Sequence, residues 1–492
     1  MHDTREARDD GEPDAGDVRM DSTAGRWVLT ATVLGSGMAM LDSTVVNLAL
    51  PRIGEDLDAS FTQLQWIVNA YTLTLAALIL LGGSLGDRLG RRRIFVTGVA
   101  WFTIASVLCA MAPTSESLIG ARALQGVGGA LLTPGSLAII QASFASADRP
   151  RAIGAWSGLG GVAAGIGPFL GGWLVDVSTW RSIFLINVPI GIAVVVIASR
   201  HVPESRDTTS SGRLDVPGAV LGAAALAGIT YGLTAQEWLI VAIGLVIAVV
   251  FVLFELRSRA PMVPMRIFRS AQFSATNVVT FLLYGAFAAA LFLLGLVLQG
   301  PLGYSPLEAG AATVPLTIMM LLFSARAGAI AQRIGPRIPM TLGPLLCAAG
   351  FALLTRVEPG RSYVSAVLPG MLVFATGLTL TVAPLTTTAL SSVASHLAGV
   401  ASGVNNAVAR TGSLVFVAAI PVVAGFTAGA AVDDATLLDG YGKVLWTSAG
   451  VAVAAGVVSA VWVRRIEPEV VPTEPPPFHC ASTGPPVSVA AD

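Results

Sequence analysis

The chain has 492 residues, of which 54% are hydrophobic and only 12% charged, and its formal net charge is −1. Average globular proteins carry about 25% charged residues, so this composition excludes an ordinary soluble enzyme, a nucleic-acid-binding protein and a secreted disulfide scaffold. The three cysteines and four histidines match no metal motif in their spacing, so we expect no metal site. The composition is that of an integral membrane protein.

Fourteen stretches of the chain are long and apolar enough for a membrane-spanning helix, which needs about 20 residues. None of them shows the alternating pattern of barrel strands, so we predict an all-α integral membrane protein with 14 spans. In chain order the predicted spans are residues 27–50, 62–86, 94–112, 117–142, 152–176, 181–199, 215–233, 238–256, 271–299, 307–331, 337–356, 362–389, 398–426 and 441–463.

Charge and proline content mark the segments outside these spans. Residues 1–26 are densely charged without an apolar run, and residues 465–492 are rich in proline, so we expect two disordered tails. If the N-terminus is cytoplasmic, only five cationic residues fall in segments on the outer side, namely Arg52, Arg181, Arg356, Arg361 and Lys443. The positive-inside rule therefore predicts that both termini are cytoplasmic.

Two short segments indicate an internal repeat. The segment GSLGDRLGRR begins at Gly83 and GAIAQRIGPR begins at Gly328, and each lies at the predicted cytoplasmic end of an even-numbered span. Four identities without a gap favour a duplicated half, and transporters with duplicated halves place a substrate path between them. The alternative is that any cytoplasmic loop attracts Arg and Gly.

Further motifs occur in a fixed order along the chain. They are LDSTVVNLALP at residues 41–51, the loop from Gly83 to Arg93, a fourth-span set (Leu118, Arg122, Gln125, Gly126, Gly128 and Gly129), a fifth-span set (Gly154, Gly167, Pro168, Gly171 and Gly172) and residues 180–191. Together these motifs resemble the major facilitator superfamily, and within it the drug:proton antiporters with 14 spans.

The resemblance covers residues 27–464 and implies a domain organisation. It implies the major facilitator fold, with an N-terminal six-helix bundle at 27–199 and a C-terminal six-helix bundle at 271–464. The segment 200–270 between them would hold a polar linker and two extra spans. The resemblance also implies that the fifth-span glycines and Pro168 form a tight, bendable seal between the halves, as exporters share, in addition to simple close packing of helices.

Asp42 is the only carboxylate that we place well inside a span, and because an acid inside the membrane is energetically costly, we take it as a candidate functional residue. Arg122 lies at a similar depth in the fourth span, so we expect the two charges to interact directly or through water and Gln125. We predict that Asp42, Arg122 and Gln125 couple proton binding to transport. The alternative is a static buried ion pair that holds two helices together.

Two other groups of residues have predicted roles. The resemblance implies that Asp87 and its neighbours latch the two halves together, through Gly83, Gly86, Asp87, Arg88, Gly90, Arg91 and Arg92. Arg410 either forms a polar wall of the cavity or lines a hydrated seam between helices. Including Arg410, the candidates for the substrate cavity are Asn47, Trp66, Asn69, Tyr71, Tyr284, Phe287, Asn405 and Arg410.

These observations predict a proton-coupled antiporter that exports amphipathic drugs or antibiotics across a bacterial inner membrane by alternating access. The chain contains no GxxxxGK[ST], HExxH or GxSxG motif, so we expect no enzymatic activity and no cofactor, with the proton gradient as the energy source. The expected partners are a small amphipathic substrate, protons and the lipid bilayer, with the chain acting as a monomer. The alternatives are an exporter of a lipid, siderophore or metabolite, and a non-transporting membrane receptor with the same fold.

Overall fold

The computed structural model describes residues 18–206, 214–258, 261–394, 397–427 and 432–464. Within these ranges all regular structure is helical, apart from one isolated backbone bridge between Val18 and Phe144. The predicted all-α class is therefore confirmed. Most of the two predicted tails (1–17 and 465–492) and residues 207–213 of the predicted linker lie outside the described residues.

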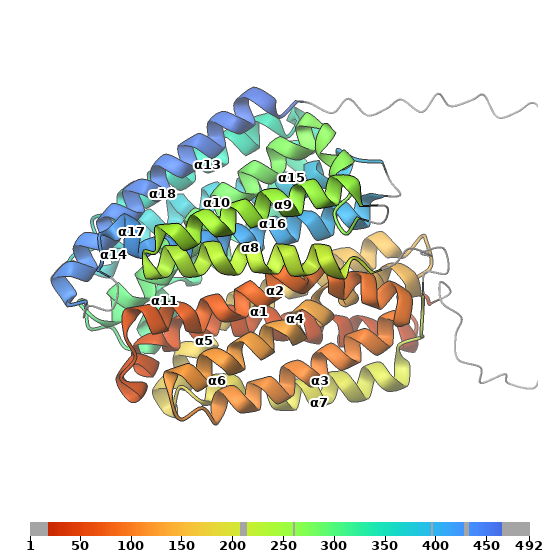
Figure 1. The fold of residues 1–492 in the computed structure, drawn as a ribbon, viewed down its shortest axis with the longest axis horizontal. Helices are drawn as coiled ribbons and strands as arrows, with labels where there is room; N and C mark the ends of the chain where they lie inside the picture. Colours follow the sequence, from red (N-terminus) through yellow and green to blue (C-terminus); the bar gives the residue numbers. More distant parts are fainter. Residues whose placement is uncertain (1–17, 207–213, 259–260, 395–396, 428–431, 465–492) are drawn as a thin grey trace, which may run out of the picture.

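Figure 1 shows two helix bundles that lie side by side. The first consists of α1 (Thr23–Leu57), α2 (Phe61–Leu89), α3 (Arg91–Ala110), α4 (Ser115–Ser143), α5 (Arg149–Val177), α6 (Ser182–Leu185) and α7 (Asn187–His201). The second consists of α10 (Ala271–Gln299), α11 (Pro306–Ala312), α12 (Val314–Ile334), α13 (Arg337–Leu354), α14 (Tyr363–Ala366), α15 (Leu368–Ser391), α16 (Ala398–Ala418), α17 (Ile420–Ala424) and α18 (Asp434–Trp462).

Two further helices connect the bundles. α8 (Val216–Ala235) packs against α2 of the first bundle and against α16 of the second, whereas α9 (Trp238–Arg257) packs mainly against α8. Most side chains of α9 are therefore exposed and apolar, which in a membrane protein is a lipid-facing surface. A short 3-10 helix, η1 (Met265–Arg269), leads from this hairpin into α10.

Proline explains where several predicted spans divide into two helices. The stretches that we predicted as single spans at 307–331, 362–389 and 398–426 break just before Pro315, Pro369 and Pro421. Proline lacks the N–H that a continuing helix needs, but it is well tolerated in the first turn of a new helix. Each of these prolines accordingly lies at the first or second position of its helix.

Thirteen helices of the described chain are long and apolar enough to cross a membrane, one fewer than the fourteen spans that we predicted. The difference is the stretch 398–426, where α16 carries Asn405, Asn406 and Arg410. These polar side chains lower the hydropathy of α16, although the helix packs lengthwise against α10 and α2 like its neighbours.

The folded part of the chain begins before residue 27, where the predicted N-terminal tail ends. α1 begins at Thr23, and the Ser22 hydroxyl caps it by accepting a hydrogen bond from the Gly25 N–H. Before it, the Val18 N–H donates to the Ser143 carbonyl and the Val18 carbonyl accepts from Ala145. Residues 18–26 of the predicted tail therefore belong to the fold, because Val18 binds to the turn between α4 and α5 and residues 23–26 form the first turn of α1.

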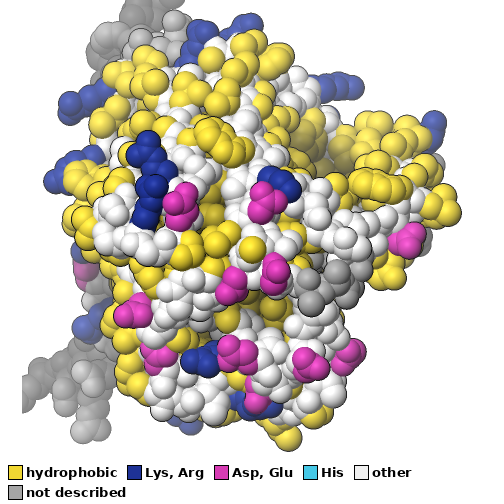
Figure 2. Space-filling model, turned by 90° about the vertical axis from the view of Figure 1, so that its left-hand side faces the viewer, with side chains coloured by type: hydrophobic (Ala, Val, Ile, Leu, Met, Phe, Trp, Pro, Cys, Tyr) yellow, Lys and Arg dark blue, Asp and Glu magenta, His cyan; other side chains and the backbone are white. Residues whose placement is uncertain are grey.

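The two ends of the molecule differ in charge. Figure 2 shows the end that lies on the left in Figure 1, where acidic side chains are spread over the surface. We call it the acidic end, and it includes Glu55, Asp56, Glu116, Asp176, Glu308, Glu358 and Asp434. α1 begins and α18 ends at the opposite end, which we call the basic end and which includes Arg88, Arg91, Arg92, Arg93, Arg149, Arg151, Arg200, Arg266, Arg269, Arg333 and Arg337.

Candidate functional site

The central feature of the first bundle is a buried ion pair between α1 and α4. The Arg122 guanidinium donates through Nη1 to Asp42 Oδ2 at 2.5 Å, and the two side chains are 1% and 0% exposed. Arg122 also donates through Nε to the Ile67 carbonyl of α2 at 3.1 Å. The structure thus brings two of the three residues that we predicted for proton coupling into direct contact.

Gln125, the third predicted residue, completes the pair. It lies one turn after Arg122 on α4, and its amide oxygen accepts from Arg122 Nη1 at 2.5 Å. Its Nε2 donates to Asp42 Oδ1 and to the Ser106 hydroxyl of α3, both at 2.7 Å. Gln125 therefore holds the carboxylate and the guanidinium together and ties both to α3.

Two residues that the sequence analysis did not place in the site, Asn187 and Ser106, extend the hydrogen-bond network around Asp42. Asn187 begins α7, and its Nδ2 donates to Asp42 Oδ1 at 3.2 Å and to Ser106 Oγ at 3.1 Å. Asn187 is 1% exposed and Ser106 is fully buried. The available signal was a polar Asn in the motif at residues 180–191, directly after a helix break.

Aromatic rings enclose the cationic side of the pair. The guanidinium carbon of Arg122 lies 4.3 Å from the centre of the Tyr71 ring and 5.8 Å from that of Phe184. Such contacts stabilise a desolvated cation by about 1–2 kcal/mol. The carboxylate and the guanidinium are therefore both satisfied by protein groups in a site closed to water.

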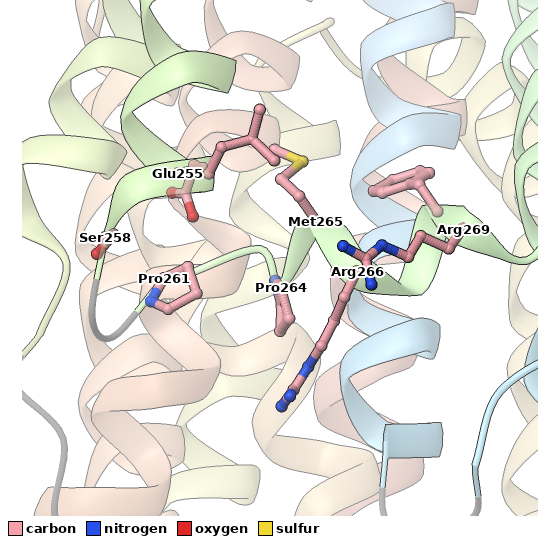
Figure 3. Close-up of a pocket in the computed structure, with 9 residues that line it drawn as sticks. Glu255, Ser258, Pro261, Pro264, Met265, Arg266 and Arg269 are labelled. Carbon is pink, nitrogen blue, oxygen red and sulfur yellow. The ribbon is translucent and has the colours of Figure 1, made fainter.

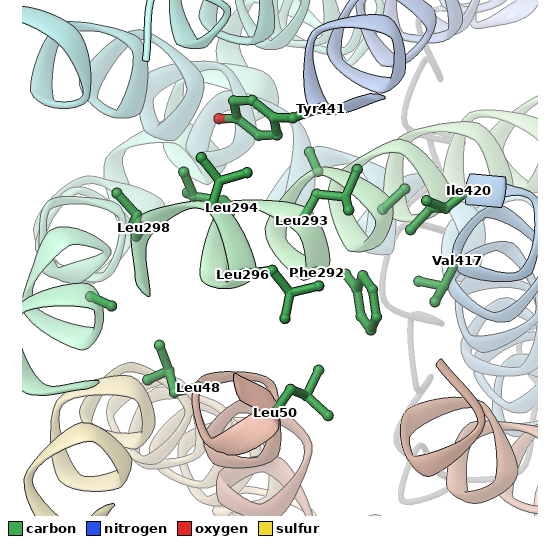
Figure 4. Close-up of a cluster of buried hydrophobic side chains, with 14 of the residues drawn as sticks. Leu48, Leu50, Phe292, Leu293, Leu294, Leu296, Leu298, Val417, Ile420 and Tyr441 are labelled. Carbon is green, nitrogen blue, oxygen red and sulfur yellow. The ribbon is translucent and has the colours of Figure 1, made fainter. Parts of the chain in front are cut away.

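The two bundles are sealed against each other at the acidic end. Figure 4 shows Leu48 and Leu50 of α1 facing Phe292 and Leu296 of α10 in one apolar cluster. Three hydrogen bonds cross the same region: Gln299 Nε2 to the Leu48 carbonyl, Gln65 Nε2 to the Val417 carbonyl, and the Leu307 N–H to Asp176 Oδ2.

The predicted fifth-span motif forms part of this seal. A Cβ atom at Gly167 or Gly171 would collide with side chains of α1, and one at Gly172 would collide with the Pro306 carbonyl of α11. Pro168 is equally close to the second bundle. A Cβ at Gly310 of α11 would collide with the Pro168 carbonyl oxygen. The absence of side chains at these glycines therefore lets α5 touch both α1 and the second bundle.

The same face of α5 is uncovered toward the basic end. Gly154, Gly158 and Gly161 continue the stripe of small residues, but a Cβ at any of them would meet no atom within 4 Å. On the facing helix α12, Thr317 contacts Gly165, whereas Leu321 one turn further on is 56% exposed. The bundles are thus closed at the acidic end and diverge along α5 and α12 toward the basic end.

The loop from Gly83 to Arg93, predicted as a latch between the halves, makes its contacts within the first bundle. Asp87 Oδ1 accepts from Arg91 Nε at 2.9 Å, and Arg92 donates through Nη1 to the Val202 carbonyl. Glu204 accepts from the Arg92 N–H at 3.1 Å. The side-chain bonds of Asp87 and Arg92 therefore lie within the first bundle and the segment directly after α7.

We expect Gly90→Ala to destabilise the protein by about 1–3 kcal/mol, the cost of a residue in a backbone region reserved for glycine. Gly90 has φ +115, and a Cβ there would lie 2.7 Å from the Glu204 carboxylate. Chemical unfolding of the purified protein in detergent measures the loss. Gly86→Ala is the matched control, because its Cβ would come no closer than 4.0 Å to any atom, and equal losses would contradict the prediction.

The structure brings together some of the predicted cavity residues. Arg410 of α16 lies close enough to the hydroxyls of Tyr71 and Tyr284 to interact electrostatically with both. It makes no hydrogen bond or ion pair among the described residues, and it is half-buried. Asn69 is fully buried on α2, and neither atom of its amide has a hydrogen-bond partner within that part of the chain. Arg410 is thus close to a tyrosine of each bundle, whereas no contact joins Asn69 to these three side chains.

Other predicted cavity residues lie elsewhere. Trp66 contacts Tyr231 of α8, with ring centres 6.2 Å apart, and Phe287 stacks on Phe374 of α15 at 5.4 Å. Asn405 donates to Asn277 and Thr280 of α10 within its own bundle. Asn47 lies half-buried on α1 near the seal.

Comparison with known proteins identifies the family to which this architecture belongs. The family model of the Major Facilitator Superfamily matches residues 32–418. The chain is 37% identical to the methylenomycin A resistance protein of Streptomyces coelicolor over 80% of this chain and 85% of that protein. It is 35% identical to the puromycin resistance protein of Streptomyces alboniger, over 92% of this chain and 95% of that protein. It is 34% identical to the multidrug efflux pump LfrA of Mycolicibacterium smegmatis, over 82% of this chain and 81% of that protein.

Solved structures show the same fold at low sequence identity. A POT family transporter in complex with 5-aminolevulinic acid superposes with a TM-score of 0.68 at 14% identity, covering 91% of this chain and 98% of that one. A D-xylose-proton symporter superposes with a TM-score of 0.63 at 14% identity, covering 89% of this chain and 98% of that one. The chain therefore belongs to the Major Facilitator Superfamily, among its drug-resistance and efflux transporters, and is a multi-pass membrane transporter and not an enzyme.

Proposed function

We propose that this chain is a proton-coupled antiporter that exports small amphipathic antibiotics or related toxic compounds from a bacterial cell. The observation that carries the proposal is the buried pair of Asp42 and Arg122, which is the one charged pair enclosed within the membrane-spanning part of the described chain. A carboxylate at such a position is costly, and its known uses in transporters include proton relay. The resistance and efflux proteins among its relatives support the direction and the kind of cargo.

We further propose that the basic end faces the cytoplasm and that the protein acts as a monomer in the inner membrane. Arginines concentrate at the basic end, as the positive-inside rule requires of cytoplasmic segments. In that orientation the seal formed by α1, α5, α10 and α11 faces outward, and the diverging faces of α5 and α12 open inward. The structure then corresponds to a state that receives cargo from the cytoplasm.

The proposed cycle depends on the fact that one helix, α1, contributes to both the ion pair and the seal. Asp42 lies on α1, which also supplies Leu48 and Leu50 to the seal. If Asp42 takes up a proton in the state open to the outside, Arg122 loses its partner there, and release of the proton toward the cytoplasm restores the pair that we observe. Inward proton flow then drives outward movement of cargo, provided the two states differ in their affinity for the proton and in their affinity for the cargo.

The proposal is tested in inside-out membrane vesicles that contain the protein and carry an imposed pH gradient. We expect addition of a transported drug to dissipate the gradient and to cause drug uptake into the vesicles. A susceptibility panel in a host lacking its own efflux pumps identifies the drug to use. Drug uptake that is indifferent to the pH gradient would contradict proton coupling, and no uptake of any resisted drug would contradict export.

A further inference from the structure

Arg410 is a cation inside the membrane-spanning part of the chain that has no counter-ion among the described residues. It lies on α16, is half-buried, and makes no hydrogen bond or ion pair with that part of the chain. Charged side chains within spans are costly, and in transporters they face the bundle interior and mark substrate or ion pathways. Asp42 is already bound by Arg122. The N–H donors of the Arg410 guanidinium are therefore available to a ligand.

The contacts between α16 and α2 place Arg410 beneath the seal. At the acidic end the Val417 carbonyl of α16 accepts a hydrogen bond from Gln65 Nε2 of α2. Arg410 precedes Val417 by two turns, and Tyr71 follows Gln65 by nearly two turns on the antiparallel helix. At 1.5 Å per residue, both side chains start about 10 Å from that hydrogen bond, on the side of the basic end.

Tyr284 of the second bundle lies at a similar depth. It precedes Phe292 of the seal by about two turns on α10. The Ser413 hydroxyl, one turn from Arg410 on α16, donates to the Tyr284 carbonyl at 3.4 Å. Arg410 interacts electrostatically with the hydroxyls of Tyr71 and Tyr284, and neither hydroxyl makes a hydrogen bond with a described residue. One guanidinium and two hydroxyls from three helices thus lie near one another.

This group lies at the closed end of the seam between the bundles, since the seal is on one side of it and the diverging faces of α5 and α12 lead away on the other. A pocket of about 660 Å³ lies elsewhere, between the end of α9 and η1 (Figure 3), and Glu255, Arg266 and Arg269 line it. That pocket carries charges of both signs, whereas the group around Arg410 carries positive charge alone. The two sites therefore differ in the ligand that they suit.

The donors around Arg410 suit an organic carboxylate. A guanidinium binds a carboxylate through two parallel N–H···O bonds, and tyrosine hydroxyls can donate to its remaining lone pairs. A cationic group would be repelled by Arg410, and a phosphate dianion carries more charge than one guanidinium neutralises. Phe287 follows Tyr284 by one turn on α10 and is half-buried, so an apolar surface adjoins the donors. The matching ligand has one carboxylate and an apolar body.

We propose that Arg410 binds a carboxylate of the cargo, with the hydroxyls of Tyr71 and Tyr284 as further donors, so that the transporter prefers amphipathic organic acids to amines and neutral compounds. This inference rests on the proposed function, because it names the class of cargo for the same transport path. The Tyr71 ring also lies 4.3 Å from the guanidinium carbon of Arg122. Cargo at Arg410 is thus one side chain away from the ion pair that contains Asp42.

Fluorescence titration of the purified full-length protein tests the preference with three probes that share one apolar body, namely pyrenebutyric acid, pyrenebutyramide and pyrenebutylamine. We expect the acid to bind about tenfold more tightly than the amide and the amine to bind most weakly, because a hydrogen bond to a charged group is worth roughly a factor of ten or more. Equal binding of acid and amide, tightest binding of the amine, or no binding of any probe would overturn the proposal. The titration needs no proton gradient, so its result is independent of whether export is proton-coupled.

Variants of Arg410 separate a binding role from a structural one. Arg410→Gln should weaken binding of the acid about tenfold, to the affinity of the amide, and leave binding of the amide unchanged. Arg410→Lys keeps the charge but not the planar fork, so it should retain the preference for the acid at reduced affinity. An Arg410→Gln protein that still prefers the acid would contradict the assignment, as would equal losses of acid and amide in both variants.

Arg266→Gln is the matched control, because it removes one exposed arginine from η1 at the other pocket (Figure 3). It should change none of the three affinities. A loss of the preference for the acid in this variant would show that the overall charge of the protein, and not Arg410, selects the probe. Tyr284→Phe should lower the affinity for the acid about threefold, since it removes one neutral donor.

Discussion

Asp42→Asn should reduce drug export to the level of a host without the transporter while the protein still reaches the membrane. The substitution keeps the shape of the side chain but removes the one charge that can bind and release a proton at this site. It also leaves Arg122 buried without its counter-ion, and breaking a buried pair from one side costs about 3–5 kcal/mol. Gradient dissipation in inside-out vesicles and the amount of folded protein must therefore be measured together.

A double variant distinguishes proton coupling from a structural pair. Asp42→Asn with Arg122→Gln removes both charges, so the folded protein should recover stability relative to the single variant. If the pair couples proton binding to export, the double variant stays inactive. Recovery of export along with stability would show that the pair only joins two helices. Asp56→Asn is the matched control, because Asp56 pairs with Arg181 at the surface, where an ion pair contributes little.

Gly172→Val should open the seal at the acidic end. A Cβ at this position would collide with the Pro306 carbonyl and would lie 2.8 Å from the Leu307 Cα, and backbone atoms cannot move aside as a flexible side chain can. Overpacking of this kind costs about 1–3 kcal/mol, and about 1.4 kcal/mol changes an equilibrium tenfold. We therefore expect the closed arrangement of α5 against α11 to lose most of its population, and export to fall with it.

The accessibility of a cysteine in the seal reports this change. Leu48→Cys should be protected from a membrane-impermeant maleimide added on the side of the acidic end, since Leu48 is 5% exposed. The same cysteine should react readily when Gly172→Val is present. Gly158→Val is the control on the same helix, because its side chain meets nothing in this arrangement, and it should leave the cysteine protected. Protection in both variants would contradict the prediction.

The sequence contains the spans and the central ion pair, because hydropathy and charge are properties of single segments. The predicted boundaries of α2 and α10 lie within a few residues of the observed ones. The sequence does not reveal which helices are neighbours, so it could not show that Asn187 of α7 binds Asp42, or that Ser106 of α3 binds Gln125 and Asn187. For the same reason Trp66 was expected to face the cavity, whereas α8 covers it.

The latch prediction shows a different limit, which concerns the state of the protein and not its fold. Motifs in the loop from Gly83 to Arg93 are the same in every conformation, but their contacts are not. In this structure Asp87 binds Arg91 beside it, and Glu204 holds Arg92. The single sequence carries both arrangements of a transporter, and one structure displays one of them.

The polar character of α16 has a consequence for how the protein is made. A translocon releases a helix into lipid according to its hydropathy, and arginine at the centre of a helix costs about 2.5–3.5 kcal/mol in that transfer. α16 carries Arg410 and two asparagines, and it lies against α10 and α2, which are synthesised earlier. Its insertion should therefore depend on helices already in the membrane, so that truncated chains ending soon after Ala418 would integrate α16 only when α10 is intact. Biogenesis of the second bundle would then be cooperative, with its least hydrophobic helix guided into place by the partners that later surround it.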